Sequence, residues 1–250
     1  MRKFGLIGYP LEHSFSKKYF EEKFQKESIS DTIYRNYPLK NISELPALIE
    51  NDPEICGLNV TIPYKKEVIS LLDYIDSEAS SAGAVNVIKI LRNKDEVILK
   101  GYNTDIYGFR ESLRPLIEGY TGNAVILGTG GSSSAVAYVL SELGIKTIFV
   151  SRQPKPGCIT YKDLTENIIK SSHLIVNTTP VGMYPATGNK PDIPYESLTS
   201  EHILYDLIYN PEQTLFLKEG VIRGCRVMNG ITMLILQAEK SWEIWNDLSR

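Results

Sequence analysis

Short apolar segments alternate with helical patterns along almost the whole chain, and this alternation constrains the fold more than any other feature. Segments of strand length fall at residues 4–8, 32–37, 56–62, 124–127, 147–150, 174–176 and 203–207. Between the first two, Tyr19, Phe20 and Phe24 recur at helical spacing among charged residues. Strands that alternate with helices form parallel sheets whose faces the helices cover. We therefore predict an α/β fold with mostly parallel sheets.

Local signals place several further elements. Ser16 stands where an N-cap belongs before a helix at 17–26, and Gly144 closes a helix at 132–143. Apolar segments at 84–91 and 96–100 flank a polar turn, which predicts a hairpin. Helical patterns also cover residues 41–50 and the chain from 231 to about 248.

The composition bounds the class of protein. At 250 residues the chain exceeds the usual size of a single core, so we expect two domains, with a single barrel as the alternative. A net charge of -3 leaves no basic field for nucleic acid. Cys56, Cys158 and Cys225 are odd in number and widely spaced, which favours a reducing compartment over disulfides or a zinc site. With neither a signal peptide nor a membrane span at its start, the chain is predicted to be cytoplasmic, without a membrane partner or bound metal.

A glycine-rich turn directly follows the apolar segment 124–127 and opens a helical pattern. It consists of Gly128, Thr129, Gly130, Gly131 and Ser132. The first glycine allows a tight turn, Gly130 lets the backbone approach a pyrophosphate, and the helix N-terminus presents free N–H groups. The context favours a dinucleotide site over a tight turn that binds nothing.

The end of the next predicted strand distinguishes the two nicotinamide cofactors. NAD sites place a carboxylate there for the ribose hydroxyls, whereas NADP sites use cations for the 2′-phosphate. This chain has Ser151 and Arg152 at that point, followed by Lys155. The sequence therefore predicts NADP, with solvated surface charges as the alternative for the two cations.

Polar residues alternate with apolar ones between positions 57 and 65. If this segment is extended, Asn59, Thr61 and Lys65 share one parity and project the same way near a strand end. Pro63 ends the ladder because it lacks an N–H group. Such a row suits a polyhydroxylated molecule, and the alternative is a half-exposed strand that ends in a solvated lysine.

Other polar residues stand at the ends of predicted elements. Ser14 and Ser16 precede a helix N-terminus, which suits a carboxylate ligand, although Ser16 alone fits a cap. Asn86 lies at a strand start and Asp105 at a helix start, where an isolated aspartate would be interpreted as an N-cap.

These motifs, in this order, resemble those of the shikimate dehydrogenase family, NADP-dependent enzymes of aromatic amino-acid biosynthesis. The resemblance extends from Gly8 to Ala238 and includes the glycine turn and residues 8–16, 57–65, 83–86, 103–108, 177–183, 206–211 and 229–238. It implies a catalytic pair, Lys65 and Asp105. The substrate contacts that it implies are Ser14, Ser16, Asn59, Thr61, Asn86, Tyr209 and Gln237. For the cofactor it implies Gly128, Thr129, Gly130, Gly131, Ser132, Ser151, Arg152, Thr178, Leu207 and Gly230.

The chain departs from the family pattern at two places. Lys17 and Tyr19 replace a usual proline and histidine after the second serine. After Arg152, the usual threonine and second arginine give way to Gln153 and Pro156, and the helix expected next is cut short. We therefore expect a weaker grip on the 2′-phosphate and some tolerance of NAD.

The resemblance implies the reversible, NADPH-dependent reduction of 3-dehydroshikimate to shikimate. It also implies two domains: a substrate-binding catalytic domain at 1–104 plus 231–250, and a Rossmann-like NADP-binding domain at 105–230. A catabolic quinate/shikimate dehydrogenase that uses NAD is one alternative, and a non-catalytic NADP-binding regulatory protein is another. A monomer or a homodimer is compatible with the sequence.

Overall fold

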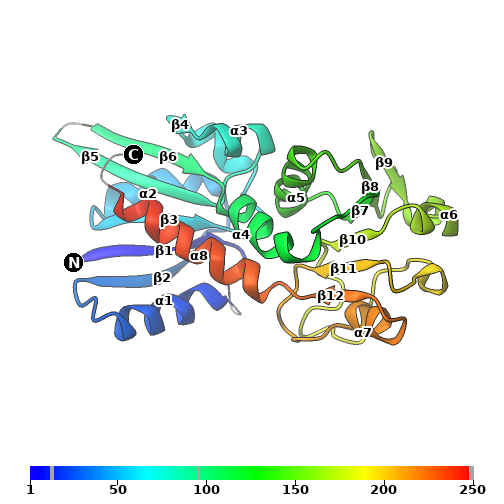
Figure 1. Ribbon diagram of the computed structural model, residues 1–250. Helices are drawn as coiled ribbons and strands as arrows, with labels where there is room; N and C mark the ends of the chain where they lie inside the picture. Colours follow the sequence, from blue (N-terminus) through cyan, green and yellow to red (C-terminus); the bar gives the residue numbers. More distant parts are fainter. Residues whose placement is uncertain (12–13, 95, 248–250) are drawn as a thin grey trace. The chain divides into compact units, whose positions relative to one another are not determined.

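The chain forms two compact units, each built on one six-stranded sheet (Figure 1). The structure is a computed structural model that describes residues 1–11, 14–94 and 96–247. Unit 1 comprises Met1–Thr104 together with the chain from Ala238 onwards, and unit 2 comprises Asp105–Gln237. Helix α4 (Thr104–Leu113) and helix α8 (Ile231–Asn246) each contribute residues to both units.

The sheet of unit 1 is mixed. Its strands are ordered β2-β1-β3-β5-β6-β4. They are β1 (Arg2–Gly8), β2 (Thr32–Pro38), β3 (Ile55–Val60), β4 (Tyr74–Ile75), β5 (Val87–Asn93) and β6 (Glu96–Tyr102). Strands β2, β1 and β3 are parallel, β5 is antiparallel to both β3 and β6, and the short β4 pairs with β6 in parallel.

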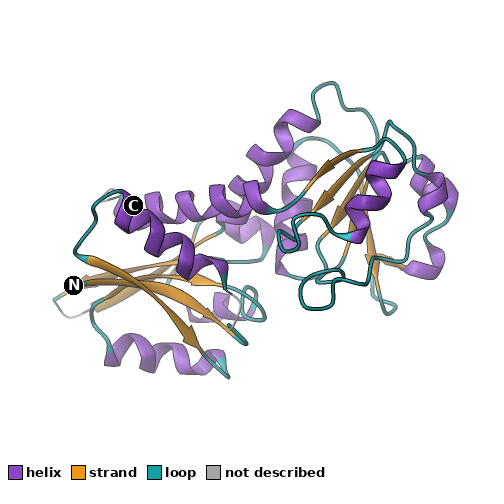
Figure 2. Ribbon diagram, turned by 90° about the horizontal axis from the view of Figure 1, so that it is seen from below, coloured by secondary structure: helices purple, strands orange, loops and turns teal. Residues whose placement is uncertain are grey.

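Helices cover both faces of this sheet (Figure 2). Successive strand residues point to opposite faces, so apolar residues on each face are buried by a separate set of helices. Phe4 faces α1 (Phe15–Lys26) and the end of α8, where its ring stacks on Trp245 at 4.8 Å between centroids. Ile7 belongs to the core on the other face. That core is closed by η1 (Ile42–Glu44), α2 (Leu45–Asn51), η2 (Glu67–Leu71) and α3 (Ser77–Ala82).

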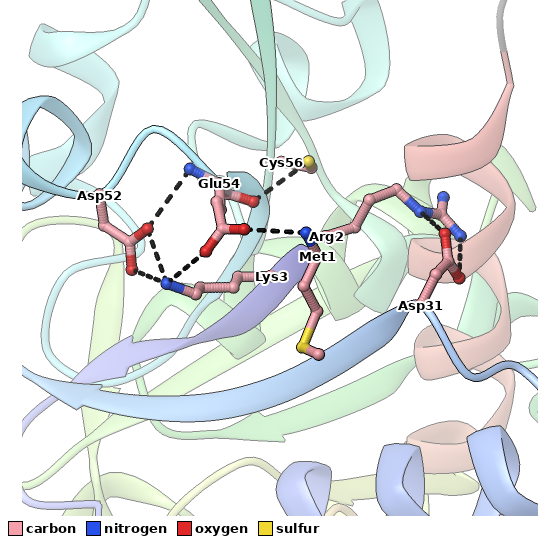
Figure 3. A network of polar contacts seen from close by, with 7 residues as sticks. All are labelled: Met1, Arg2, Lys3, Asp31, Asp52, Glu54 and Cys56. Carbon is pink, nitrogen blue, oxygen red and sulfur yellow. Dashed lines mark hydrogen bonds and ion pairs between the residues drawn. The ribbon is translucent and has the colours of Figure 1, made fainter.

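A charged network fastens the start of β1 to its neighbours (Figure 3). The Lys3 ammonium lies 2.8 Å from an Asp52 oxygen and 2.9 Å from a Glu54 oxygen. The N-terminal ammonium donates to the other Glu54 oxygen, and these two cations lower the pKa of Glu54 to about 2. On the opposite side, Arg2 pairs with Asp31. These ion pairs join the start of β1 to the segments that precede β2 and β3, and we assign them a structural role in unit 1.

The sheet of unit 2 is entirely parallel, with strand order β12-β11-β10-β7-β8-β9. Its strands are β7 (Ala124–Leu127), β8 (Thr147–Ser151), β9 (Cys158–Thr160), β10 (Leu174–Asn177), β11 (Ile203–Asp206) and β12 (Arg226–Met228). Its other elements are α4, η3 (Arg114–Leu116), α5 (Gly131–Glu142), η4 (Tyr161–Asp163), α6 (Glu166–Lys170), η5 (Tyr195–Ser197) and α7 (Leu215–Ile222).

Both faces of the second sheet are buried as well. One face packs against η4, α6, η5 and α7 in a single apolar cluster. On the other face, Phe109 of α4 contacts Tyr205 of β11 edge to face, while α5 packs on β7 and β8. Because helices cover both faces of the sheet, the sequence of each central strand is a continuous apolar segment.

The structure confirms the α/β fold, the mostly parallel sheets, the seven predicted strands and the predicted hairpin. The short strands β4, β9 and β12 were not predicted, because two or three residues carry no periodicity. Asp95 in the predicted turn and the predicted end of the last helix near 248 lie outside the described residues. None of the helices described within residues 1–247 is long and apolar enough to span a membrane.

Two local predictions were wrong. The extended segment ends at Val60, and Ile62–Lys66 form a turn, so Lys65 does not share a strand face with Asn59. Helix α1 begins earlier than expected, with Ser14 at the N-cap and Ser16 inside the first turn. The turn after β3 is closed locally, because the Tyr64 N–H donates to the Thr61 carbonyl, whereas the Ser16 side chain turns towards Tyr34 in β2.

Candidate active site

The glycine turn is a strained connection between β7 and α5. Gly128 has φ +112°, a region that side chains disfavour, and its N–H donates to the Val150 carbonyl at 2.9 Å. A Cβ atom at Gly128 would lie 2.6 Å from the Thr178 hydroxyl oxygen. Helix α5 follows with twelve residues, Gly130 as its N-cap and no acidic residue in its first turn. Its N-terminal N–H groups and positive dipole end therefore suit an anion such as a pyrophosphate.

The other predicted cofactor residues of unit 2 lie along the same edge of the sheet, because parallel strands all end there. Thr178 follows β10 and donates to the Leu127 carbonyl at 2.6 Å. Leu207 follows β11, and its N–H donates to the Asn177 carbonyl at 3.0 Å. Gly230 follows β12 and lies directly against the backbone of Leu207, which leaves no room for a side chain. The structure thus brings the cofactor candidates of five adjacent strands to one edge.

The end of β8 carries a cation and no carboxylate. Ser151 is half-buried, Arg152 and Lys155 are exposed, and no ion pair with another described residue engages either cation. Burial raises the pKa of Tyr161 in η4, and the positive charge of Arg152 opposes that rise. A loop at 152–157 connects the parallel strands β8 and β9 without a helix. The shortened segment after Arg152, predicted from the sequence, is confirmed.

A buried carboxylate lies beneath this edge. Asp206 is fully buried and accepts hydrogen bonds from Asn177 Nδ2 at 3.0 Å, the Ile208 N–H at 3.1 Å and the Thr214 hydroxyl at 2.6 Å. Burial raises the pKa of Asp206 to about 6 although the hydrogen bonds lower it. Asn177 Oδ1 in turn accepts from the N–H and hydroxyl of Thr179. Hydrogen bonds therefore connect the loops after β10 and β11 where these loops leave the sheet.

Several predicted substrate residues of unit 1 belong to one buried hydrogen-bonded chain. A side-chain hydrogen bond joins Ser16 to Tyr34. The Tyr34 hydroxyl donates to Asn59 Oδ1 at 2.8 Å, and Asn59 Nδ2 donates to the Ser241 hydroxyl oxygen at 3.0 Å. Tyr34, Asn59 and Ser241 are 2%, 5% and 0% exposed. Ser16 and Asn59, distant in sequence, are thus linked through Tyr34.

The chain continues from Ser241 to the second predicted amide. The Ser241 and Thr104 hydroxyl oxygens are 3.2 Å apart. Asn86 Oδ1 accepts the Thr104 N–H at 2.7 Å, and Asn86 Nδ2 donates to the Thr104 hydroxyl oxygen at 3.1 Å. Thr104 directly precedes Asp105 at the start of α4. The group that orients Asn86 therefore also begins the helix that carries Asp105.

Thr61 and Lys65 lie in the turn that leaves β3. The Thr61 N–H donates to the Ile7 carbonyl at 2.9 Å. The Lys65 carbonyl accepts from the Val85 N–H at 2.7 Å, and the buried Tyr64 hydroxyl donates to the Leu39 carbonyl at 2.7 Å. The Lys65 side chain is half-buried, whereas Lys66 is exposed. Tyr64 and Val85 fix the backbone on both sides of the lysine.

Ser14 contributes a buried hydroxyl group. Within residues 1–11, 14–94 and 96–247, no hydrogen-bond partner reaches the buried Ser14 Oγ. A buried polar atom without a partner is costly, and this one belongs to the N-cap residue of α1. This geometry supports the carboxylate site predicted at Ser14.

Three predicted residues belong to unit 2. Asp105 is 6% exposed in the first turn of α4, and Gln237 is 9% exposed on α8. Gly108 of α4 lies against Gln237 and Met233, so these two helices meet close to both predicted residues. Tyr209 is half-buried on the loop after β11. Asp105 and Gln237 are therefore near each other within unit 2.

Sequence reasoning missed the residues that hold the candidates in place. Asn177, Asp206 and Thr104 lie inside the motifs, so their positions gave a signal for them. Tyr34 and Ser241 lie outside every motif, and only the tertiary contacts reveal them. Among the described residues, no group of three or more His, Cys, Asp or Glu side chains is placed to hold a metal ion.

Comparisons with known proteins show which family the chain resembles in sequence. Residues 6–88 match the family model described as the shikimate dehydrogenase substrate binding domain. The shikimate dehydrogenase (NADP(+)) of Methanococcus aeolicus is 37% identical over 258 residues, which cover 96% of this chain and 90% of the relative.

Solved structures extend the similarity to the fold. The crystal structure of shikimate dehydrogenase 1 from Peptoclostridium difficile has a TM-score of 0.83 and 38% identity, and covers 100% of this chain and 94% of its own. Shikimate 5-dehydrogenase from Thermus thermophilus, in complex with NADP(H) and shikimate, has a TM-score of 0.84 and 28% identity, over 98% and 94% of the two chains. On its sequence and its fold, the chain belongs to the shikimate dehydrogenase family.

Proposed function

We propose that the protein is a shikimate dehydrogenase that catalyses the reversible, NADPH-dependent reduction of 3-dehydroshikimate to shikimate in aromatic amino-acid biosynthesis. The observation that carries this proposal is the full-length similarity to enzymes of that name. The glycine turn, the cation after β8 and the unpartnered Ser14 hydroxyl support it independently.

Each unit receives one ligand in this proposal. Unit 1 would be the substrate-binding catalytic domain, because it contains Lys65 and the Ser14–Ser16 segment. Unit 2 would be the NADP-binding domain, because every cofactor candidate lies at one edge of its sheet. Three further residues that the resemblance assigns to catalysis or to the substrate, Asp105, Tyr209 and Gln237, belong to unit 2.

The substrate would be held by its carboxylate and its hydroxyl groups. Ser14 and Ser16 at the start of α1 would bind the carboxylate, with the N–H groups of the helix adding attraction. Both Asn59 Nδ2 hydrogens are already used, by Ser241 and the Asn86 carbonyl, so Asn59 has only a lone pair of Oδ1 to offer. Asn59 would therefore accept a hydrogen bond from a substrate hydroxyl, beside Thr61 and Asn86.

Lys65 would be the proton donor. When bound, NADPH would supply the hydride that the carbonyl carbon of the substrate needs for its reduction. The ammonium group of Lys65 would polarise the carbonyl oxygen and give it a proton as negative charge grows there, which completes the new hydroxyl group. Asp105 would orient the lysine and one substrate hydroxyl. In the reverse direction, the amine of Lys65 would remove the same proton.

NADP is the cofactor that the end of β8 fits. A carboxylate at this point would repel a 2′-phosphate, and the chain has Ser151 and the exposed Arg152 there. Gly128 to Ser132 would hold the pyrophosphate at the N-terminus of α5, and Thr178, Leu207 and Gly230 would line the remainder of the edge. The loop at 152–157 offers Lys155 as a second cation.

One assay tests the proposal directly. NADPH oxidation is followed by absorbance after addition of 3-dehydroshikimate to the purified protein, and we expect turnover that depends on both compounds. The same assay in reverse compares shikimate with quinate and NADP⁺ with NAD⁺. Efficient quinate oxidation with NAD⁺ would favour the catabolic alternative, and absence of any turnover would favour a regulatory protein. A cytoplasmic location and a monomer or homodimer remain our predictions.

A further inference from the structure

A buried polar chain in unit 1 connects two amides that have no sequence proximity. We name it the Tyr34–Ser241 network, and it consists of Tyr34, Asn59, Ser241, Thr104 and Asn86. All five residues are 5% exposed or less. Its links come from β2, β3, α8, the start of α4 and the residue before β5. Buried polar groups are costly unless satisfied, so a chain of this kind fixes its members in one arrangement.

The hydrogen bonds determine the orientation of Asn59. Asn59 Nδ2 donates a hydrogen bond to the backbone carbonyl oxygen of Asn86 at 3.4 Å. A carbonyl oxygen only accepts hydrogen bonds, so the side-chain nitrogen of Asn59, and not its oxygen, must face Asn86. Oδ1 then faces Tyr34, whose hydroxyl donates to it. Removal of that hydroxyl would leave Oδ1 without its protein donor and weaken the reason for this orientation.

The aromatic packing determines where the Tyr34 hydroxyl lies. Its ring stacks on Phe20 of α1 with centroids 4.5 Å apart and an interplanar angle of 14°. Burial raises the pKa of Tyr34 well above its ordinary value, so the group stays a neutral O–H donor at every physiological pH. Tyr34 thus presents a fixed hydrogen-bond donor to Asn59 Oδ1. Ser241 presents a hydrogen-bond acceptor to Asn59 Nδ2.

We propose that Tyr34 and Ser241 are positioning residues for the substrate, because they hold Asn59 and, through Thr104, Asn86 in the orientation that accepts the substrate hydroxyls. This inference rests on the proposed function. Neither residue needs to touch the ligand. Their effect is on the affinity for shikimate, because the two amides that they hold are predicted substrate contacts.

The same strand provides a matched control. Tyr37 is also on β2, and its buried hydroxyl has no hydrogen-bond partner among the described residues. Tyr34→Phe and Tyr37→Phe therefore remove the same atom from the same strand, but only the first breaks a hydrogen bond. Ser241→Ala interrupts the network at its other end and serves as a second, independent variant.

The experiment measures the Kd of shikimate by calorimetry and the KM of shikimate and NADP⁺ in the oxidation assay, after circular dichroism has verified folding. For Tyr34→Phe and Ser241→Ala we expect the Kd and KM of shikimate to rise about tenfold, the scale of one buried polar group left unsatisfied. The KM of NADP⁺ should stay unchanged, and Tyr37→Phe should match the wild type in all three quantities.

Three outcomes would overturn the inference. Tyr34→Phe could behave like Tyr37→Phe, or it could lower thermal stability without altering the shikimate constants, or it could raise the constants of both ligands together. Measurements on the wild type distinguish failure of this inference from failure of the proposed function. If the wild type binds and oxidises shikimate, the proposed function stands whatever the variants do. If the wild type does not bind shikimate, both the inference and the proposed function are wrong.

Discussion

Single residues of the candidate site are positioned by contacts that their own segment does not contain. Lys65 lies in the turn after β3, and this turn is anchored by the Tyr64 hydroxyl on one side of the lysine and by the Val85 N–H on the other. Two such contacts restrict the backbone more than a strand end would. The lysine therefore projects from a rigid base, which a proton donor requires for a fixed distance to its substrate.

Substitution of Lys65 tests the predicted proton donor. Lys65→Ala should lower kcat by about 100-fold or more, the scale of lost general acid catalysis, with only a modest change in shikimate affinity. Lys66→Ala is the matched control, because Lys66 is the adjacent, exposed lysine. Steady-state kinetics in both directions measure the effect. A Lys65→Ala enzyme with near wild-type turnover would remove the assignment.

Substitution of Arg152 tests the cofactor preference. Arg152→Ala should raise the KM of NADP⁺ and leave that of NAD⁺ unchanged, because only NADP⁺ carries the 2′-phosphate. Loss of a charge-assisted contact gives roughly a tenfold effect. Lys155→Ala measures whether the neighbouring cation shares this role. An equal rise for both cofactors would contradict a phosphate contact.

Among the elements of unit 2, the loops at the carboxyl ends of the strands are held together by a buried carboxylate, Asp206. Asp206 receives three hydrogen bonds, and these tie the loop after β11 to the loop after β10 and to the N-cap of α7, which is Thr214. The two loops carry Thr178, Leu207 and Tyr209. A single buried carboxyl group thus sets the spacing of residues predicted to contact both ligands.

The titration of Asp206 makes a contribution to stability that depends on pH. Its folded-state pKa, about 6, is above the ordinary value of 3.8, so the folded protein binds the proton more tightly than the unfolded chain. This contribution is complete below pH 4 and is lost as the pH rises through 6. About two pKa units correspond to at most about 3 kcal/mol.

Asp206→Asn isolates this effect, because the amide keeps an acceptor for Asn177 and Ile208 and is able to donate to Thr214. The free energy of unfolding of the wild type minus that of Asp206→Asn should fall between pH 4 and pH 7, measured by chemical denaturation. Asp163→Asn is the control. Bonds to Thr160 lower the pKa of Asp163, so its difference should stay constant between pH 5 and pH 7. A flat profile for Asp206→Asn would refute the buried titration.

At the scale of the whole molecule, the chain closes its first unit with its last helix. Trp245 of α8 stacks on Phe4, and its indole N–H donates to the Ile88 carbonyl at 3.0 Å. Trp242 packs edge to face on the same phenylalanine. One face of the first sheet therefore depends on residues that are synthesised after the second unit.

Truncation after Gln237 tests this dependence. The shortened chain loses two tryptophans from the apolar cluster of unit 1, and a buried tryptophan is typically worth about 3 to 5 kcal/mol, a large part of the stability of one unit. Hydrogen exchange should show lost protection in β1, β3 and β5, with protection retained in β7, β10 and β11. A chain that ends at Asp247 is the control and should keep both sheets protected. Equal protection in the two truncated chains would contradict the dependence.

The elements and the motifs were predictable from the sequence, because both depend on local patterns. Apolar runs of strand length identify β1, β3, β7, β10 and β11 without any knowledge of their neighbours. The glycine turn is identified by its position between a strand and a helix, since the φ of Gly128 and the N-terminus of α5 are consequences of a few adjacent residues. The same locality allowed the family resemblance.

The contacts that hold the candidate residues were not predictable from the sequence, because they join distant segments. Asn59 and Ser241 are 182 residues apart in sequence and 3.0 Å apart in the fold, and no periodicity encodes such a contact. The partners at the end of β3 are also distant in sequence, because the Val60 N–H donates to the Asn86 carbonyl and the Thr61 N–H donates to the Ile7 carbonyl. Local patterns fix backbone conformation, whereas the orientation of a buried polar side chain is fixed by donors and acceptors that other elements deliver.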